Sequence, residues 1–139
     1  MKRVFLDTNI LIDLLNEKRE KNYLAKKLIE KLINEDYEIF ISEDMLSTVY
    51  YVVKNQKKVL NFYKDIVYDK YWHIVPFEKE VIEEAIEFSL KNDNDFEDLL
   101  QCFTAKKYNA ILITEDKKFV DCGIKVLGYE EFLRDDYEF

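Results

Sequence analysis

Four aspartates in this sequence occur where carboxylates can act together chemically. Asp7 directly follows a short apolar run, and Asp116 closely follows another. Asp95 and Asp98 open an amphipathic stretch at a spacing that puts them on neighbouring positions of one helix face. Several like charges in one place are costly without a neutralising partner, so the set predicts a site for a divalent cation. The simpler interpretation, that each aspartate only caps a helix, explains each one singly but not the set.

The composition leaves few other groups for catalysis. His73 is the only histidine and lies in an apolar run, where a core or edge histidine is the default. Zinc therefore has too few nitrogen and sulfur ligands. With two glycines, no phosphate loop or dinucleotide-binding motif can be written. Clustered carboxylates suit a hard cation such as Mg²⁺ or Mn²⁺.

Apolar runs that alternate with helical periodicity must position these acids. The runs that predict strands are 4–6, 38–41, 73–75, 110–113 and 124–127. The stretches that predict helices are 10–15, 24–33, 45–53, 59–67, 81–88, 96–103 and 130–134, with 16–22 as a loop. This alternation predicts a three-layer α/β/α sandwich around a central, mostly parallel sheet of 4–5 strands. All four aspartates then lie at the sheet edge where ligands bind.

Length and charge bound the answer further. At 139 residues and 48% hydrophobic, the chain 1–139 is expected to form one domain. It has no apolar run of membrane-spanning length and no export signal, and Cys102 and Cys122 lack zinc or redox-motif spacing, so we expect a cytoplasmic protein with reduced thiols. The net charge of −8 argues mildly against nucleic acid, although an acidic metal pocket makes the total negative even beside basic patches.

Three stretches carry a resemblance to a known family. Residues 5–11, Phe-Leu-Asp-Thr-Asn-Ile-Leu, resemble the first motif of the PIN-domain family of metal-dependent ribonucleases, which includes the toxins of VapBC toxin–antitoxin systems. Residues 95–101, Asp-Phe-Glu-Asp-Leu-Leu-Gln, followed by Ala105 and by 114–116, resemble its third and fourth motifs. No single motif is very specific, but their order and spacing together are, and they span nearly the whole chain.

The resemblance implies an activity and a site. Asp7, Asp98 and Asp116 would hold one or two Mg²⁺ (or Mn²⁺) ions, with Asp95 as a further catalytic carboxylate, to hydrolyse RNA phosphodiesters. The residues expected to orient these carboxylates or a water are Thr8, Asn9, Thr114 and Thr48. A strand-end threonine such as Thr114 can also be only a cap. The implied partners are RNA, a cognate antitoxin and a second copy of the chain in a homodimer.

One departure from the family pattern concerns a second acid. The family usually has a glutamate where this chain has Thr48. Glu43 lies about 140° around a helix from that position, so it is not a simple substitute. Asp44 is one turn below on the same face, and Asp95 is a third candidate. Which of the three replaces the glutamate, and whether one or two metals bind, stays open.

Basic residues near the acids are candidates for phosphate contacts. Lys117 and Lys118 flank Asp116, and Arg19 lies with Lys18 and Lys21 in the loop after the first helix. Lysines on a solvated face are common, so these residues have an equally simple interpretation as surface charge.

Other functions fit the pattern less well. A haloacid-dehalogenase-type phosphatase needs an aspartate where Asn9 stands. A response-regulator receiver needs a phosphoacceptor aspartate at the end of the third strand, where Pro76 stands, and a lysine after the fifth, where Gly128 stands. The remaining alternative is a degenerate PIN domain that binds RNA or a protein without cleavage, and Thr48 is the feature that favours it.

Overall fold

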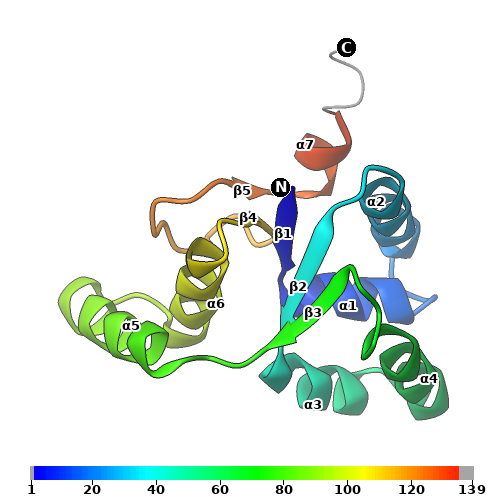
Figure 1. Cartoon of the computed structure of the whole chain (residues 1–139), viewed down its shortest axis with the longest axis horizontal. Coiled ribbons are helices and arrows are strands. Elements are labelled where there is room, and N and C mark those ends of the chain that lie inside the picture. Colours follow the sequence, from blue (N-terminus) through cyan, green and yellow to red (C-terminus); the bar gives the residue numbers. More distant parts are fainter. Residues whose placement is uncertain (1, 135–139) are drawn as a thin grey trace.

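The computed structural model describes residues 2–134, which form a five-stranded sheet with helices on both faces (Figure 1). Every pairing is parallel, in the order β3-β2-β1-β4-β5. The strands are β1 Arg3–Leu6, β2 Glu38–Ser42, β3 Trp72–Val75, β4 Ile111–Ile113 and β5 Val126–Leu127. The helices are α1 Thr8–Leu15, α2 Asn22–Asn34, α3 Glu43–Val52, α4 Gln56–Ile66, α5 Lys79–Asn92, α6 Phe96–Lys107 and α7 Tyr129–Arg134. The α/β class and the parallel sheet are confirmed.

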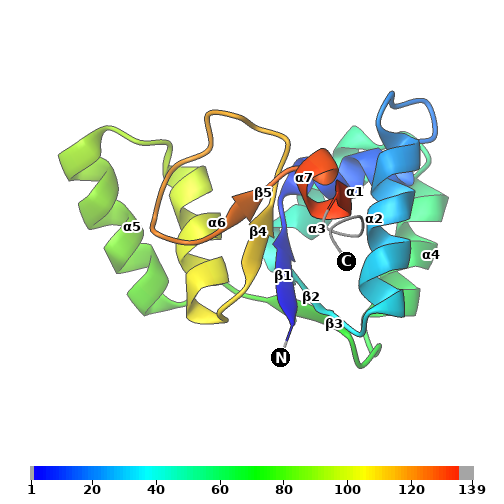
Figure 2. The ribbon, with the colours of Figure 1, turned by 90° about the horizontal axis from the view of Figure 1, so that it is seen from above.

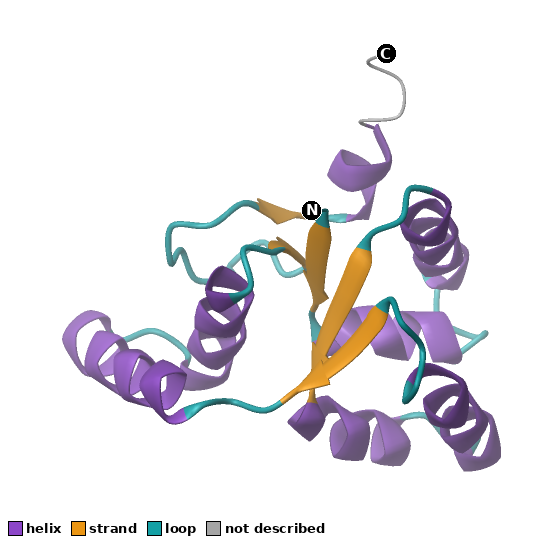
Figure 3. Ribbon diagram, in the orientation of Figure 1, coloured by secondary structure: helices purple, strands orange, loops and turns teal. Residues whose placement is uncertain are grey.

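The central strand explains why the sheet needs helices on both sides. Val4, Phe5 and Leu6 of β1 are all fully buried, because successive side chains of a strand point to opposite faces and both faces are covered. Helices α5 and α6 cover one face, and α1, α2, α4 and α7 lie on the other (Figures 1 and 2). In Figure 3 the strands lie between these two groups of helices.

The strand order creates a switch point beside β1. The chain runs outward from β1 to β2 and β3, then crosses over through α5 and α6 so that β4 pairs with the other side of β1. Adjacent connections therefore leave in opposite directions at the carboxyl ends of β1 and β4. Such a divergence opens the crevice in which parallel α/β folds bind their ligands.

Most elements begin or end within a few residues of the predicted positions, and two of the differences have a visible structural basis. Helix α2 begins at Asn22, which the sequence assigned to the loop, because the Asn22 amide donates to the carbonyl oxygens of Asp13 (2.8 Å) and Leu14 (3.2 Å). Strand β5 begins only at Val126, so the first two residues of the predicted 124–127 strand lie in the preceding loop. The start of α2 is set by these side-chain hydrogen bonds, and β5 begins where its pairing with β4 begins, at Val126 opposite Leu112.

The prediction of reduced cysteines is wrong for this structure. Cys102 of α6 and Cys122 of the segment 114–125 form a disulfide, with their Cα atoms 6.2 Å apart. Spacing along the chain gave no sign of this pair, because the fold alone brings the segment after β4 back over α6.

Buried apolar side chains form two clusters. The sheet cluster comprises most of the core, from the strands to the helices on the α1 side. The small cluster lies between α5, α6 and the segment 114–125, and consists of Val81, Ala85, Leu99, Cys102, Phe103, Val120 and Cys122. Among residues 2–134, no helix has both the length and the apolar character needed to cross a membrane.

Candidate functional site

Asp7 stands at the carboxyl end of β1, at the switch point. Its backbone N–H donates to the Ile113 carbonyl (3.0 Å), which extends the pairing of β1 with β4 by one step. Its side chain is 7% exposed, and the Thr114 hydroxyl at the end of β4 donates to Asp7 Oδ2 at 2.8 Å. Thr114 therefore orients Asp7 from the neighbouring strand and is more than a strand-end cap.

The position of Asp7 is electrostatically unfavourable for a carboxylate alone. Burial raises the pKa of Asp7 above its ordinary value. Hydrogen bonds from Thr114, the Thr8 backbone and Gln101 offset part of this rise, whereas the nearby charge of Asp116 adds to it. Among residues 2–134, the donors that face this desolvated carboxylate are all neutral. A cation at this point would stabilise the ionised form.

Asp98 enters the same region from α6. Asp95 is the N-cap of this helix and accepts a hydrogen bond from the Asp98 backbone N–H at 3.0 Å. Burial, and then the charges of Asp95, Asp116, Asp7 and Glu97, raise the pKa of Asp98 to about 6. Charges act in this way only over short separations, so the acids of β1, α6 and the segment after β4 converge.

Asp116 completes the predicted set on the open side. The residue is exposed, and its backbone N–H donates to the Thr114 hydroxyl oxygen at 3.1 Å. Thr114 Oγ1 thus bonds both to the Asp7 carboxylate and to the backbone of Asp116. Asp116 Oδ1 accepts from the Lys118 backbone N–H at 2.9 Å, which fixes the turn after β4.

The position of the missing family glutamate does not reach the acids. Thr48 is exposed, and its hydroxyl bonds back to the Asp44 carbonyl of its own helix at 3.4 Å. Glu43 is exposed in the first turn of α3. The Asp44 carboxylate accepts from the Ser42 hydroxyl, and its charge helps to raise the pKa of Glu97, after the larger effect of burial. Asp44 therefore lies near Glu97.

Sequence reasoning missed two residues of this region. Glu97 stands between Asp95 and Asp98 in the sequence. Burial, and then the charges of Asp44, Asp95 and Asp7, raise its pKa above the ordinary value. Gln101 is 1% exposed, and its Nε2 donates to Thr8 Oγ1 at 3.3 Å. Both lie inside the stretch that resembles the third motif, and the alternation of acids there was the available signal for Glu97.

The ligand types of these acids fit a hard cation, although their side chains do not form a coordination sphere as they are placed. Asp7, Asp98, Asp116, Asp95 and Glu97 offer only oxygen, which Mg²⁺ and Mn²⁺ prefer. Within residues 2–134, however, no three His, Cys, Asp or Glu side chains stand close enough to hold one ion as they are placed. Like charges placed together repel one another, so the charge of an ion would favour a closer approach of these carboxylates.

The polar side chains expected to assist the acids divide into two kinds. Thr8 is 7% exposed and bonded to Gln101, and Thr114 is 4% exposed and bonded to Asp7. Asn9 is exposed, and its side chain forms no hydrogen bond or ion pair with another residue of 2–134. Thr8 and Thr114 are thus built into the site, whereas Asn9 faces solvent at its edge.

The basic residues near the site differ in whether their charged groups are already paired with an acid. Lys117 and Lys118 are exposed, and neither forms an ion pair with another residue of 2–134. The Arg19 Nε bonds to Asp13 Oδ1 at 2.9 Å, and Asp13 is 4% exposed. The Tyr129 hydroxyl also donates to Asp13, at 2.7 Å. Arg19 therefore fastens its loop to the core, and the two lysines are the better candidates for phosphate contacts.

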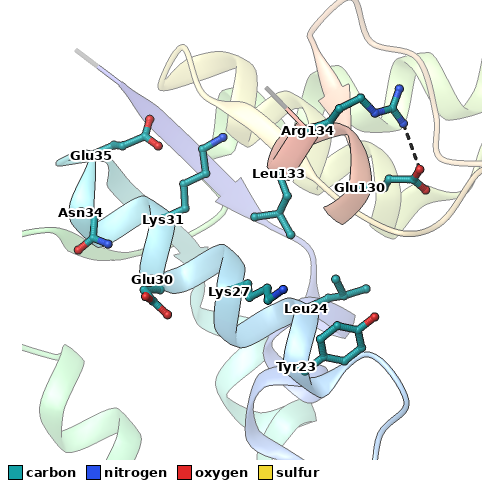
Figure 4. Close-up of a pocket in the computed structure, with 10 residues that line it drawn as sticks. All are labelled: Tyr23, Leu24, Lys27, Glu30, Lys31, Asn34, Glu35, Glu130, Leu133 and Arg134. Carbon is teal, nitrogen blue, oxygen red and sulfur yellow. Dashed lines mark hydrogen bonds and ion pairs between the residues drawn. The ribbon is translucent and has the colours of Figure 1, made fainter. Parts of the chain in front are cut away.

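A hollow of about 580 Å³ borders Asp116, bounded by the segment 114–121 and by β5. A larger one of about 780 Å³ lies between α2 and α7 (Figure 4). Its lining carries charges of both signs, and none of the strand-end acids contributes to it. The larger of the two hollows is therefore not the one beside the strand-end carboxylates, and size alone does not identify the candidate site.

Comparison with known proteins agrees with this geometry. Residues 4–125 match the family described as PIN domain. The chain is 35% identical over 136 residues to Ribonuclease VapC1 of Aquifex aeolicus, covering 94% of this chain and 93% of that protein.

Two solved structures show the same fold. One is VapC20 of Mycobacterium tuberculosis, described as a sarcin-ricin loop cleaving toxin (TM-score 0.69, 16% identity, 87% of this chain and 95% of that one). The other is VapBC2 of Rickettsia felis, bound to a DNA fragment from its promoter (TM-score 0.67, 20% identity, 91% and 98%). The switch-point acids, the match over residues 4–125 and the related ribonuclease lead to one conclusion: this chain belongs to the PIN domain family.

Proposed function

We propose that this protein is a divalent-cation-dependent endoribonuclease and the toxin of a toxin–antitoxin pair. The observation that carries the proposal is the approach of Asp7, Asp98 and Asp116 to one another at the switch point, where burial, and then the charges of Asp95, Asp116 and Asp7, raise the pKa of Asp98 to about 6. The 35% identity to Ribonuclease VapC1 along 94% of the chain supports RNA as the substrate.

The roles follow from the contacts. Asp7, Asp98 and Asp116 would hold Mg²⁺ or Mn²⁺, which supplies an activated water and stabilises the charge that develops on the phosphodiester. Thr114 fixes Asp7 through a 2.8 Å hydrogen bond, and Asp95 fixes the first turn of α6 that carries Asp98. Asp44 and Glu97 extend the acidic region toward α3, and we propose them in place of the family glutamate.

RNA would approach from the open side of the site. Asp116, Lys117 and Lys118 are exposed there, and the hollow beside them offers room for a nucleotide. The two ammonium groups would bind phosphates next to the cleaved bond and partly neutralise the acidic surface. Arg19 would contribute indirectly, by holding its loop against Asp13.

The proposed partners follow from the relatives. VapBC2 of Rickettsia felis was solved bound to a DNA fragment from its promoter, and a further structure of the same fold is a toxin–antitoxin complex from Klebsiella pneumoniae. We propose an equivalent antitoxin for this chain, a homodimeric assembly, and action in the cytoplasm, where cellular RNA is found. A partner encoded directly upstream, with a DNA-binding start, would support this assignment.

Cleavage of a single-stranded RNA tests the activity. With subsaturating Mg²⁺, wild type should cut the RNA, and Asp7→Asn or Asp98→Asn should lose at least roughly tenfold in rate, about 1.4 kcal/mol. Asp65→Asn, the same change at an exposed acid of α4, is the matched control and should cleave as wild type does. RNA binding without any cleavage would instead identify a degenerate PIN domain.

A further inference from the structure

Gln101 is a buried polar side chain that the roles above do not use. It lies in α6, on the face that carries Asp98 one turn earlier, and it is 1% exposed. Its neighbours along the helix, Leu99, Cys102 and Phe103, belong to the small apolar cluster. An amide in such surroundings is unfavourable unless both of its ends are hydrogen-bonded.

One end of the amide is used, and it faces the acids. Gln101 Nε2 donates to Thr8 Oγ1 at 3.3 Å, and as a neighbouring donor it also lowers the pKa of the Asp7 carboxyl group slightly. Asp7 and Thr8 stand at the junction of β1 and α1, whereas Gln101 belongs to α6. The amide therefore links the helix that carries Asp98 to the strand end that carries Asp7.

The other end has no partner. Gln101 Oε1 is buried and accepts no hydrogen bond from any residue between 2 and 134. Rotating the amide by half a turn would not help, because the NH₂ group would then be withdrawn from the Asp7 carboxylate and the oxygen turned toward it. A buried acceptor beside a group of carboxylates calls for a small donor molecule, and water is the smallest.

We propose that Gln101 is a positioning residue of the cation site: its amide nitrogen fixes Asp7 and Thr8, and its free carbonyl oxygen accepts a hydrogen bond from a water bound to the cation. This inference rests on the proposed cation-dependent function. In this inference, the buried Gln101 carbonyl oxygen serves the binding of the cation and does not stabilise the fold. Stability and cation affinity should therefore respond differently when the amide is removed.

The test is calorimetric titration of the metal-free protein with Mn²⁺ alone, combined with thermal unfolding. Gln101→Leu keeps much of the side-chain volume and removes both polar ends. We expect it to weaken Mn²⁺ binding by roughly tenfold or more, while the melting temperature of the metal-free protein stays the same or rises, because an unpaired buried acceptor is gone.

Thr104→Val is the matched control. Thr104 is equally buried on the same helix, but its hydroxyl donates to the Leu100 carbonyl at 2.6 Å and touches none of the acids. It should bind Mn²⁺ within about twofold of wild type. Gln101→Met, which is unbranched, carries the same expectation as Gln101→Leu if the latter does not fold.

The outcomes separate this inference from the proposed function. Wild-type affinity in Gln101→Leu or Gln101→Met, with normal Mn²⁺ binding by wild type, would overturn the role of Gln101 alone. A lower melting temperature of the metal-free variant with unchanged affinity would assign the amide to folding and would equally overturn it. No Mn²⁺ binding by the wild-type protein would overturn the cation-dependent function itself.

Discussion

The two apolar clusters differ in how the elements that they contain carry the acids of the candidate site. The sheet cluster carries Asp7 and Thr114 directly on the ends of its adjacent strands β1 and β4, where both faces are covered by helices. The small cluster carries Asp98 next to Leu99, and Asp116 lies in the segment that contributes Val120 and Cys122. The site thus spans the boundary between the two.

This difference means that the acids of one site lie on two supports, one in a large core and one in a small core cross-linked by a disulfide. Strand ends within a large core are fixed by many neighbours, and Asp7 is accordingly buried and hydrogen-bonded by Thr114. The small cluster has few apolar side chains, and a disulfide compensates for them by tying α6 to the segment after β4. A cation between Asp7, Asp98 and Asp116 would connect both parts.

Removing apolar volume should affect the two clusters unequally. Leu112 of β4 is fully buried in the sheet cluster, and Leu112→Ala should lower the free energy of unfolding by about 2–5 kcal/mol. Val81→Ala in the small cluster should cost only about 1–2 kcal/mol. Denaturant unfolding measures both changes, and native-state amide exchange shows where each variant opens.

The pattern of opening is the sharper comparison. Leu112→Ala should raise exchange throughout the sheet, whereas Val81→Ala should raise it mainly in α5 and α6. Equal exchange over the whole chain in both variants would mean that the clusters form one cooperative unit.

Breaking the disulfide should loosen the small cluster. Cys102 and Cys122 are 20 residues apart, and closing a loop of that size stabilises a folded chain by about 3 kcal/mol in the chain-entropy account. Reduction, or the double variant Cys102→Ala with Cys122→Ala, should therefore lower the free energy of unfolding by roughly this amount. Mn²⁺ affinity should fall as well, because Asp98 and Asp116 are then no longer tied together.

Reductant added to the double variant is the control and should change nothing. The reduced form matters if the protein acts in the cytoplasm, as proposed, because the cytosol of most organisms other than hyperthermophiles keeps thiols reduced. Wild type that unfolds at the same denaturant concentration with and without reductant would contradict a stabilising cross-link.

Protonation of Asp98 should give the smallest effect. Its pKa is raised from 3.8 to about 6 in the folded protein, so between these values the native state binds more protons than the unfolded chain. Stability of the metal-free protein should therefore fall as pH rises from 4 to 6 and level off above. At pH 7, Asp98→Asn should be more stable than wild type by about 1 kcal/mol, a value discounted for partial exposure.

Unfolding in EDTA at pH 4 and at pH 7 measures this difference. The advantage of Asp98→Asn should nearly vanish at the lower pH, and Asp65→Asn should show no such change. An advantage of equal size at both pH values would mean that Asp98 is not under strain from its neighbours. Cation affinity should follow the opposite course and increase over the same interval, because protons and cation compete.

Much of the fold could be predicted because each local signal agreed with the parallel sheet. Strand β1 is an uninterrupted apolar run ended by Asp7, and α6 begins at an aspartate whose side chain caps it. The strand order could not be read in this way, since apolar patterning states that a strand is buried and not which strand is its neighbour. The disulfide could not be predicted either, because the sequence does not show that Cys102 and Cys122 become neighbours in the fold.

The site was accessible only in part. The positions after β1 and β4 marked Asp7, Thr114 and Asp116, and the structure places them at adjacent strand ends, although their catalytic roles stay predictions. Gln101 could not be found from the sequence, because the direction of its side chain depends on how α6 packs against β1 and the start of α1. Arg19 looked free in a polar loop, yet it pairs with the buried Asp13.

The central claim, that the acids of the two clusters share a cation, is tested most directly by thermal unfolding in MgCl₂ and in NaCl of matched ionic strength. A cation that binds only the native state stabilises it by about 2.7 kcal/mol at 100 times its dissociation constant. Because about 1 kcal/mol shifts the melting temperature of a chain this size by roughly 2–6 °C, a rise of several degrees is expected.

Matched NaCl is essential, because general screening also relieves repulsion among carboxylates. The account predicts that Mg²⁺ raises the melting temperature of wild type and of Asp65→Asn but not that of Asp98→Asn. An identical melting temperature of wild type in MgCl₂ and in matched NaCl would contradict it, because acids that gain nothing from the ion do not hold it.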